Sequence, residues 1–242
     1  MLQNLPYGSV VLSAWLKEQG YSFSLQQNYR QSDWLTSIGK GVMVRTGQKL
    51  VLAGAINALQ YQAGIALHIG GRTALGMLGY AHYLEINKQD TLVFAPHDTH
   101  IPSWLKNNTW DSNPHFIKTT FLPYGSGLLE YEQNGFPVRI AGAARAYMEC
   151  LELAPDQFDL TEAWEIMQGL SLLQHELVMQ LLIECKSVKV KRLFLYFAEK
   201  ADHAWFRKLK PDEIDLGKGK RSLVKSGIYI SKYKITLPEN LI

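Results

Sequence analysis

The chain has 242 residues, 47% of them hydrophobic and 19% charged, and a formal net charge of +3. These values exclude a disordered or fibrous chain and suit one large globular domain or two smaller ones, each with its own core. No stretch approaches the roughly 20 consecutive apolar residues of a membrane helix. The first residues also lack the basic start and apolar middle of a signal peptide. We therefore expect a cytoplasmic protein that does not associate with membranes.

The first part of the chain reads as two short helices followed by a hairpin. Residues 8–20 carry an apolar stripe of helical period, which ends at Gly20. A second helix starts near Ser22 or Ser24 and continues toward residue 34. Two β-like runs then flank Gly39-Lys40-Gly41, a sequence typical of a hairpin turn. The order helix, turn, helix, hairpin predicts a winged helix-turn-helix domain in residues 1–48.

In a winged helix the second helix enters the major groove, and the hairpin lies against the neighbouring DNA backbone. We expect Leu25, Tyr29 and Trp34 to face inward, so that the glutamines and the arginine of the second helix face outward with side chains that read base edges or phosphates. The candidate DNA-binding residues are Gln26, Gln27, Tyr29, Arg30, Gln31, Lys40 and Arg45. The alternative is that these are ordinary solvated residues of a helix-and-hairpin unit within another kind of protein.

The remainder, residues 49–242, reads as a mixed α/β body to about residue 140 and as mainly helical and basic after it. A helix is expected in residues 51–63, and short strands in 66–69, 91–95 and 116–122. Asn134-Gly135 predicts a hairpin turn between strands at 128–131 and 138–140. Helical periodicity follows in residues 143–153, 159–169, 175–185 and 188–204. The predicted fold class is α+β, with an N-terminal winged helix-turn-helix, a mixed α/β body and a helical C-terminal third.

Features that would indicate an enzyme are weak. Gly70-Gly71-Arg72 separates a predicted strand from a helix, where free N–H groups can cradle a phosphate. The sequence fits neither GxxxxGK[ST] nor GxGxxG, however, so a tight turn is favoured. His97 and His100 have a spacing that could bind a metal, but only Asp98 accompanies them, and a surface loop is the simpler account. We expect no catalysis, no cofactor and no metal.

Positive charge is concentrated near the C-terminus. Residues 186–234 hold fourteen Lys or Arg against five Asp or Glu, whereas residues 48–185 hold seven against fourteen. A helix that turns Val190, Leu193, Phe194 and Phe197 toward the core would leave its basic residues on the solvent-exposed face. This predicts a second surface that faces a polyanion, made of Lys189, Lys191, Arg192, Lys218, Lys220, Arg221 and Lys225. Two alternatives stay open: an RNA- or nucleotide-binding accessory protein, and a basic region that docks onto an acidic partner.

Several motifs, in order and over nearly the whole length, resemble those of the AbiEi family of transcriptional regulators and antitoxins of type IV abortive-infection toxin–antitoxin systems. They are Asp33-Trp-Leu-Thr-Ser-Ile-Gly-Lys-Gly-Val42, His68-Ile-Gly-Gly-Arg-Thr-Ala-Leu75, Gly79-Tyr-Ala-His-Tyr-Leu84, Pro102-Ser-Trp-Leu105, Ala144-Arg-Ala146, Ser187-Val-Lys-Val-Lys-Arg-Leu-Phe194 and Leu216-Gly-Lys-Gly-Lys-Arg-Ser-Leu-Val-Lys225.

The resemblance implies a winged-helix N-terminus joined to an antitoxin domain in residues 49–242. It also implies that the basic C-terminal surface serves the antitoxin activity or reinforces nucleic-acid binding. It implies a regulator that represses its own operon by binding operator DNA at upstream inverted repeats. The expected counterpart is a nucleotidyltransferase-like toxin, which type IV antitoxins counteract without an obligatory complex. The free protein's oligomeric state stays open, and a monomer that binds DNA cooperatively is compatible with the resemblance.

Overall fold

The computed structural model describes residues 5–80, 90–224 and 226–242. The chain folds into two compact units, and it passes between them several times. The first contains residues 1–69, 87–118 and 130–140, and the second contains residues 70–86, 119–129 and 141–242. The predicted boundary at residue 48 stays a prediction.

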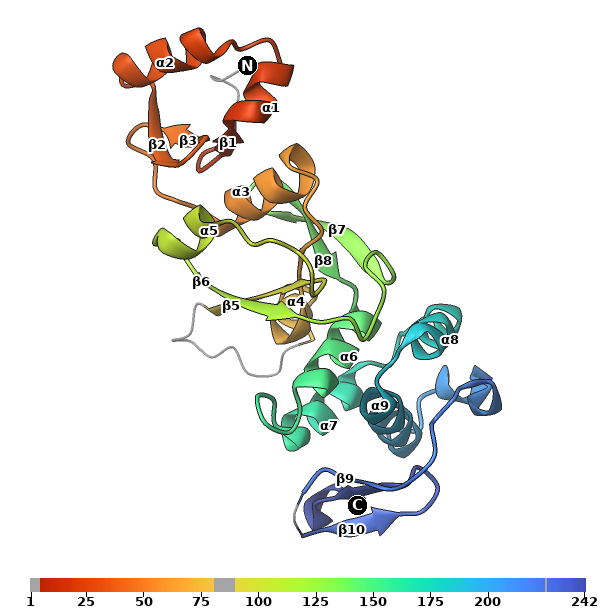
Figure 1. Cartoon of the computed structure of the whole chain (residues 1–242). Helices are drawn as coiled ribbons and strands as arrows, with labels where there is room; N and C mark the ends of the chain where they lie inside the picture. Colours follow the sequence, from red (N-terminus) through yellow and green to blue (C-terminus); the bar gives the residue numbers. More distant parts are fainter. Residues whose placement is uncertain (1–4, 81–89, 225) are drawn as a thin grey trace. The chain divides into compact units, whose positions relative to one another are not determined.

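The first unit begins with the predicted helix-turn-helix and hairpin (Figure 1, red and orange). Its strands form a three-stranded antiparallel sheet in the order β1-β3-β2, so that the N-terminal strand pairs with the second arm of the hairpin. The prediction of a helix over all of residues 8–20 is wrong in its first part, because residues 10–12 form this strand and the helix covers residues 13–18. Ser22 caps the second helix by accepting a hydrogen bond from the N–H of Leu25. The winged-helix arrangement is confirmed. Its elements are β1 (Val10–Leu12), α1 (Ser13–Glu18), α2 (Phe23–Gln31), β2 (Leu35–Gly39) and β3 (Val42–Arg45).

A small apolar core holds this arrangement together. Val11, Leu16, Leu35 and Met43, from β1, α1, β2 and β3, are each at most 2% exposed. Tyr29 of α2 packs against this cluster and remains partly exposed. The apolar stripes predicted from the sequence therefore meet around one centre, which fixes α2 against the sheet.

The first unit also holds a five-stranded mixed sheet in the order β6-β5-β4-β8-β7. β5 runs parallel to β6 and antiparallel to β4, whereas β4 runs parallel to β8. Asn134 and Gly135 join the last two strands with φ angles of 53° and 79°, the left-handed pair that a tight hairpin turn needs. The predicted hairpin is confirmed. The strands are β4 (His68–Ile69), β5 (Asp90–Ala95), β6 (Asn113–Lys118), β7 (Leu128–Gln133) and β8 (Phe136–Ala141).

One turn of π-helix connects the winged helix to the larger sheet. It is η2 (Ala58–Gln62), and it continues α3 (Leu52–Asn57). The Gln62 amide accepts from the N–H of Leu12 at 2.8 Å and donates to the carbonyl of Val10 at 2.9 Å, as a neighbouring strand would. The Gln60 amide does the same on β8: it accepts from the N–H of Arg139 and donates to that residue's carbonyl and to the carbonyl of Leu67. Two side chains thus satisfy the backbone of both sheets.

The second unit is helical as far as residue 200 and then changes character. The central helix is α6 (Ala143–Leu153), and it packs against α4 (Gly71–Met77), α7 (Leu160–Gly169), α8 (His175–Glu184) and α9 (Val188–Lys200). Short 3₁₀ turns follow at Phe206–Lys208 and Pro211–Glu213, and a last one lies at Glu239–Leu241. Between them is a three-stranded sheet in the order β10-β11-β9, which the sequence analysis did not predict. Its strands are β9 (Arg221–Ser222), β10 (Ile228–Ile230) and β11 (Ile235–Leu237).

We predict that Gln60→Leu lowers the free energy of unfolding by about 2–4 kcal/mol, because a side chain of similar size leaves three buried backbone groups without their partner. Urea denaturation followed by circular dichroism measures this change. The matched control is Gln19→Leu, at an exposed glutamine of the same unit, which should stay within about 0.5 kcal/mol of the parent. Equal effects of the two substitutions would contradict the role assigned to the Gln60 amide.

Candidate nucleic-acid interfaces

The outer face of α2 carries short polar side chains. Its exposed residues include Ser24, Gln27, Asn28, Arg30 and Gln31. Amide side chains can pair with the edge of an adenine base, and hydroxyl and guanidinium groups can contact phosphate oxygens. Ser24 and Asn28 join the residues predicted from the sequence, because they share this face at helical spacing.

The prediction that Gln26 faces outward is wrong. This side chain is 1% exposed. Its amide donates to the carbonyl oxygens of Ser13, at 3.1 Å, and Tyr21, at 2.8 Å, and its oxygen accepts from the Ser13 hydroxyl. Those carbonyls lie at the start of α1 and in the turn between the helices. Gln26 therefore fixes the turn and is not available to a base.

The other predicted DNA-binding residues have mixed exposure. Arg30 and Lys40 are exposed, and Lys40 lies at the tip of the hairpin. Tyr29 and Arg45 are half-buried. Trp34 was expected to face inward, but 52% of it is exposed, and its ring centroid lies 6.5 Å from that of Tyr29. Trp34 lies at the end of the turn between α2 and β2, and its ring is outside the small core.

The hairpin is held in place from outside the winged helix. The Asn108 side chain donates to the carbonyl of Ile38 at 2.9 Å and to that of Trp104 at 2.7 Å, which joins β2 to α5 (Ser103–Asn107). Gly39 lies so close to Trp104 that a Cβ atom there would be 2.6 Å from the Trp104 Cβ. The wing therefore has a fixed position, and a side chain at Gly39 would displace it.

The prediction that the basic residues of α9 lie on the wet side is wrong. Lys191 is 6% exposed, and its ammonium donates to the carbonyl of Asp215 at 2.8 Å. Lys189 is half-buried and donates to the carbonyls of Glu152 and Ala154. Burial lowers the pKa of the Lys189 ammonium, and the nearby Glu152 carboxylate opposes that shift. The acceptors of Lys189 are carbonyls at the C-terminal end of α6, and that of Lys191 lies in the loop before β9. The last carbonyls of a helix have no helical partner.

Arg192 makes more hydrogen bonds than Lys189 or Lys191. It is 1% exposed, and its guanidinium donates to four carbonyl oxygens at 2.8–3.1 Å. Burial, and then the charge of Arg221, lower the pKa of this guanidinium. The acceptors belong to the loop before β9 and to the turn before β11, so Arg192 holds the C-terminal sheet. They are the carbonyls of Leu216, Gly217, Gly219 and Lys234.

The remaining basic residues of the second predicted surface differ from those of α9. Lys218, Lys220 and Arg221 are exposed in and before β9. Lys225 lies outside the described residues. The second surface therefore reduces, within the part of the chain that the structure describes, to these three side chains of the Leu216–Lys225 motif.

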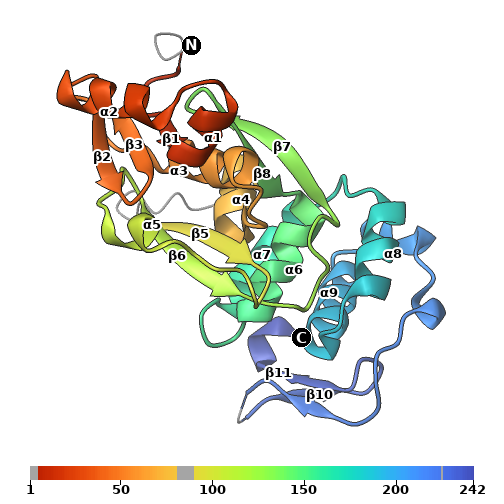
Figure 2. The same cartoon turned by 45° about the horizontal axis from the view of Figure 1, so that its top comes forward.

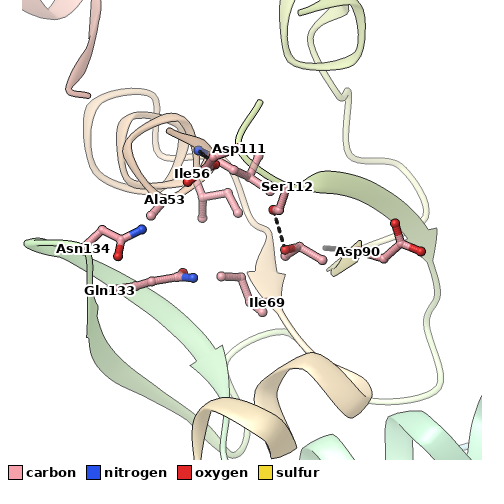
Figure 3. Close-up of a pocket in the computed structure, with 10 residues that line it drawn as sticks. Ala53, Ile56, Ile69, Asp90, Asp111, Ser112, Gln133 and Asn134 are labelled. Atoms are coloured by element: carbon pink, nitrogen blue, oxygen red, sulfur yellow. Dashed lines mark hydrogen bonds between the residues drawn. The ribbon is translucent and has the colours of Figure 1, made fainter. Parts of the chain in front are cut away.

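A polar cavity of about 190 Å³ lies in the first unit, between α3, β5 and the β7–β8 turn (Figure 3). Two carboxylates, Asp90 and Asp111, and the amides of Gln133 and Asn134 line it. Asp111 already accepts a hydrogen bond from the N–H of Leu52 at 2.8 Å. Because the lining residues in the described chain include carboxylates and no cation, this cavity does not suit a phosphate group.

The glycine pair at residues 70–71 does not form an open phosphate cradle. The N–H of Gly71 donates to the Glu149 carboxylate at 2.9 Å, and that carboxylate also accepts from Arg145 at 2.9 Å. All three residues are buried. The N–H that would bind a phosphate therefore already has an anionic partner, in agreement with the predicted tight turn. Among the described residues no three His, Cys, Asp or Glu side chains form a group that could hold a metal ion.

The chain matches two family models in succession. Residues 1–86 match the model described as "Transcriptional regulator, AbiEi antitoxin N-terminal domain", and residues 88–238 match that described as "Transcriptional regulator, AbiEi antitoxin, Type IV TA system". The chain belongs to the AbiEi antitoxin family. AbiEi proteins are transcriptional regulators and antitoxins of type IV toxin–antitoxin systems, so the resemblance predicted from the motifs is confirmed.

The fold of this AbiEi chain is similar to that in the crystal structure of the RV2827C protein from Mycobacterium tuberculosis. The TM-score is 0.60 over 97% of this chain and 87% of that chain, at 14% sequence identity. At this identity the similarity shows a shared fold. No curated protein matches the sequence. Across the described residues, no helix combines the length and the hydropathy required to span a bilayer.

We predict that Arg192→Met lowers the free energy of unfolding of this AbiEi chain by about 3–5 kcal/mol, because four carbonyls lose the charged donor of a buried side chain. The matched control is Arg221→Met, at an exposed position, which should change the free energy of unfolding by no more than about 0.5 kcal/mol. Thermal and urea denaturation measure both. A stable Arg192→Met protein would show that the C-terminal sheet is held by other contacts.

Proposed function

We propose that the protein is a DNA-binding repressor of its own operon and an antitoxin that acts without catalysis in the cytoplasm. The observation that supports the first part best is the geometry of α2 and the wing. The helix has an accessible polar face, and the hairpin tip carries an exposed cation in a fixed position. The family's N-terminal domain of a transcriptional regulator covers this segment.

In this proposal α2 lies in the major groove, with Gln27, Asn28 and Gln31 on base edges. Arg30 at the border of the helix face and Lys40 on the wing contact phosphates, and Arg45 supports the wing side of the interface. Tyr29 belongs to the small core and positions α2. Residues 1–47 hold only four Lys or Arg against two Asp or Glu. So few phosphate contacts give weak binding by one copy, which favours two copies bound cooperatively at inverted repeats.

The antitoxin part of the proposal concerns the second unit. We propose that it counteracts a nucleotidyltransferase-like toxin, without a requirement for a stable complex between the two proteins. Lys218, Lys220 and Arg221 are the exposed part of the basic surface, since the cations of α9 are committed to carbonyl groups. These three residues and Lys225 carry the antitoxin activity in this proposal.

We predict that Gln27→Ala weakens binding to the DNA upstream of the operon by about 1–3 kcal/mol, because a base-edge contact is lost. Arg30→Ala and Lys40→Ala should each reduce the slope of log K against log salt by about 0.9, as expected for one lost phosphate contact. Fluorescence anisotropy with labelled operator DNA at several salt concentrations measures both effects. The control is Lys118→Ala, which removes an exposed cation at the end of β6 in the same unit. If Gln27→Ala, Arg30→Ala and Lys40→Ala all bind like the parent, α2 and the wing do not contact the operator.

We predict that Lys218→Gln, Lys220→Gln and Arg221→Gln, combined, impair rescue of toxin-expressing cells while the melting temperature stays within a few degrees of the parent, because exposed charges contribute little to stability. Growth after induction of the toxin measures rescue. A variant with Lys208→Gln and Lys210→Gln, two exposed lysines of the same unit, is the matched control. Full protection by the triple variant would remove this surface from the antitoxin activity.

A further inference from the structure

The C-terminal sheet has one face toward the protein core and one toward solvent. Residues directly opposite each other on paired strands project to the same side. Arg221, Ile235 and Ile230 form one such row, and Ile235 is fully buried. The next row, Ser222, Thr236 and Tyr229, therefore lies on the solvent side. Figure 2 shows β10 and β11, the two strands of this hairpin, side by side.

Tyr229 is an exposed aromatic residue of this outer face, on the edge strand β10. It is 39% exposed. Lys220 lies two residues before Ser222 and thus on the same side, and its ammonium is 4.9 Å from the centroid of the Tyr229 ring. An exposed aromatic ring can stack on a nucleic-acid base, and a cation beside the ring can bind the adjoining phosphate.

The surroundings of Tyr229 are strongly positive. Residues 216–238 contain six Lys or Arg and no Asp or Glu. Lys232 is bound to the Glu199 carboxylate, whereas Lys218, Lys220, Arg221 and Lys234 are exposed. The nearest preceding carboxylate in the sequence, Asp215, accepts a hydrogen bond from the N–H of Gly217. Within the part of the chain that the structure describes, no ion pair with a carboxylate is formed by these four exposed cations.

We infer that this face binds single-stranded RNA, with an unpaired base stacked on Tyr229 and the adjoining phosphates on Lys220 and Lys218. Cations alone would fit any polyanion, but an exposed ring calls for a base that is free to stack. The bases of duplex DNA are stacked on one another, whereas RNA offers unpaired bases in loops and at ends. The flexible Lys220 side chain moves from the ring to a phosphate when the base enters. The site goes beyond operator binding and does not depend on the winged helix.

The test is fluorescence anisotropy with a labelled, unstructured oligouridylate of about ten nucleotides, a length within the usual site size of such surfaces. Tyr229→Ala should raise the Kd roughly 5- to 100-fold, while Tyr229→Phe, which keeps the ring, should bind like the parent. Lys220→Gln should reduce the salt slope by about 0.7, the value for one phosphate contact to a single strand. The matched control is Arg207→Gln, whose exposed guanidinium is paired with Asp202 in the same unit. It should leave the Kd and the salt slope unchanged.

Three further measurements separate the outcomes. Duplex DNA should not respond to Tyr229→Ala, and single-stranded DNA of matching sequence should bind more weakly than the RNA. Equal or tighter binding of the single-stranded DNA, or an RNA affinity that Tyr229→Ala does not change, overturns the inference. Operator binding is measured on the same proteins. Tyr229→Ala should retain it and Gln27→Ala should lose it, so the failure of this inference and the failure of the proposed repressor function are distinguishable.

Discussion

The structure depends on one constraint: backbone groups that lie outside a regular ladder must still find a partner when they are buried. In the first unit Gln60 and Gln62 supply that partner for β8 and β1. In the second unit Arg192 supplies it for the loops around the C-terminal sheet. Long polar side chains thus supply the hydrogen bonds that a neighbouring strand would otherwise supply.

This constraint changes what the charge of the chain means. The basic residues of α9 bind carbonyl groups, so most of the positive charge in that motif is internal structure. Of the two basic motifs, the second is the one whose positive charge reaches solvent, at Lys218, Lys220 and Arg221. The two basic motifs of the sequence, residues 187–194 and 216–225, therefore act together. The first anchors the second, and the second presents Lys218, Lys220 and Arg221.

The parts of the fold that were predictable have local causes. Asn134-Gly135 specified its hairpin because both residues tolerate left-handed backbone. Which polar residue of α2 is buried was less predictable. Leu25 and Tyr29 define the apolar stripe, and Gln26 and Asn28 lie at equal angles on its two sides. Only the carbonyls of Ser13 and Tyr21, which are set by the tertiary fold, decide that Gln26 is buried. Arg192 was misassigned for the same reason, since its acceptors lie at least 24 residues away in the sequence. The C-terminal sheet was missed because its strands have only two or three residues.

The amide of Gln62 has a consequence for how copies of the protein can meet. An unpaired sheet edge invites a strand from another molecule, and proteins commonly block such edges. The outer edge of β1 is already occupied by this side chain. Two molecules on adjacent half-sites therefore cannot fuse their wing sheets at β1 into one continuous ladder. Cooperativity between them therefore does not arise from a ladder shared at β1.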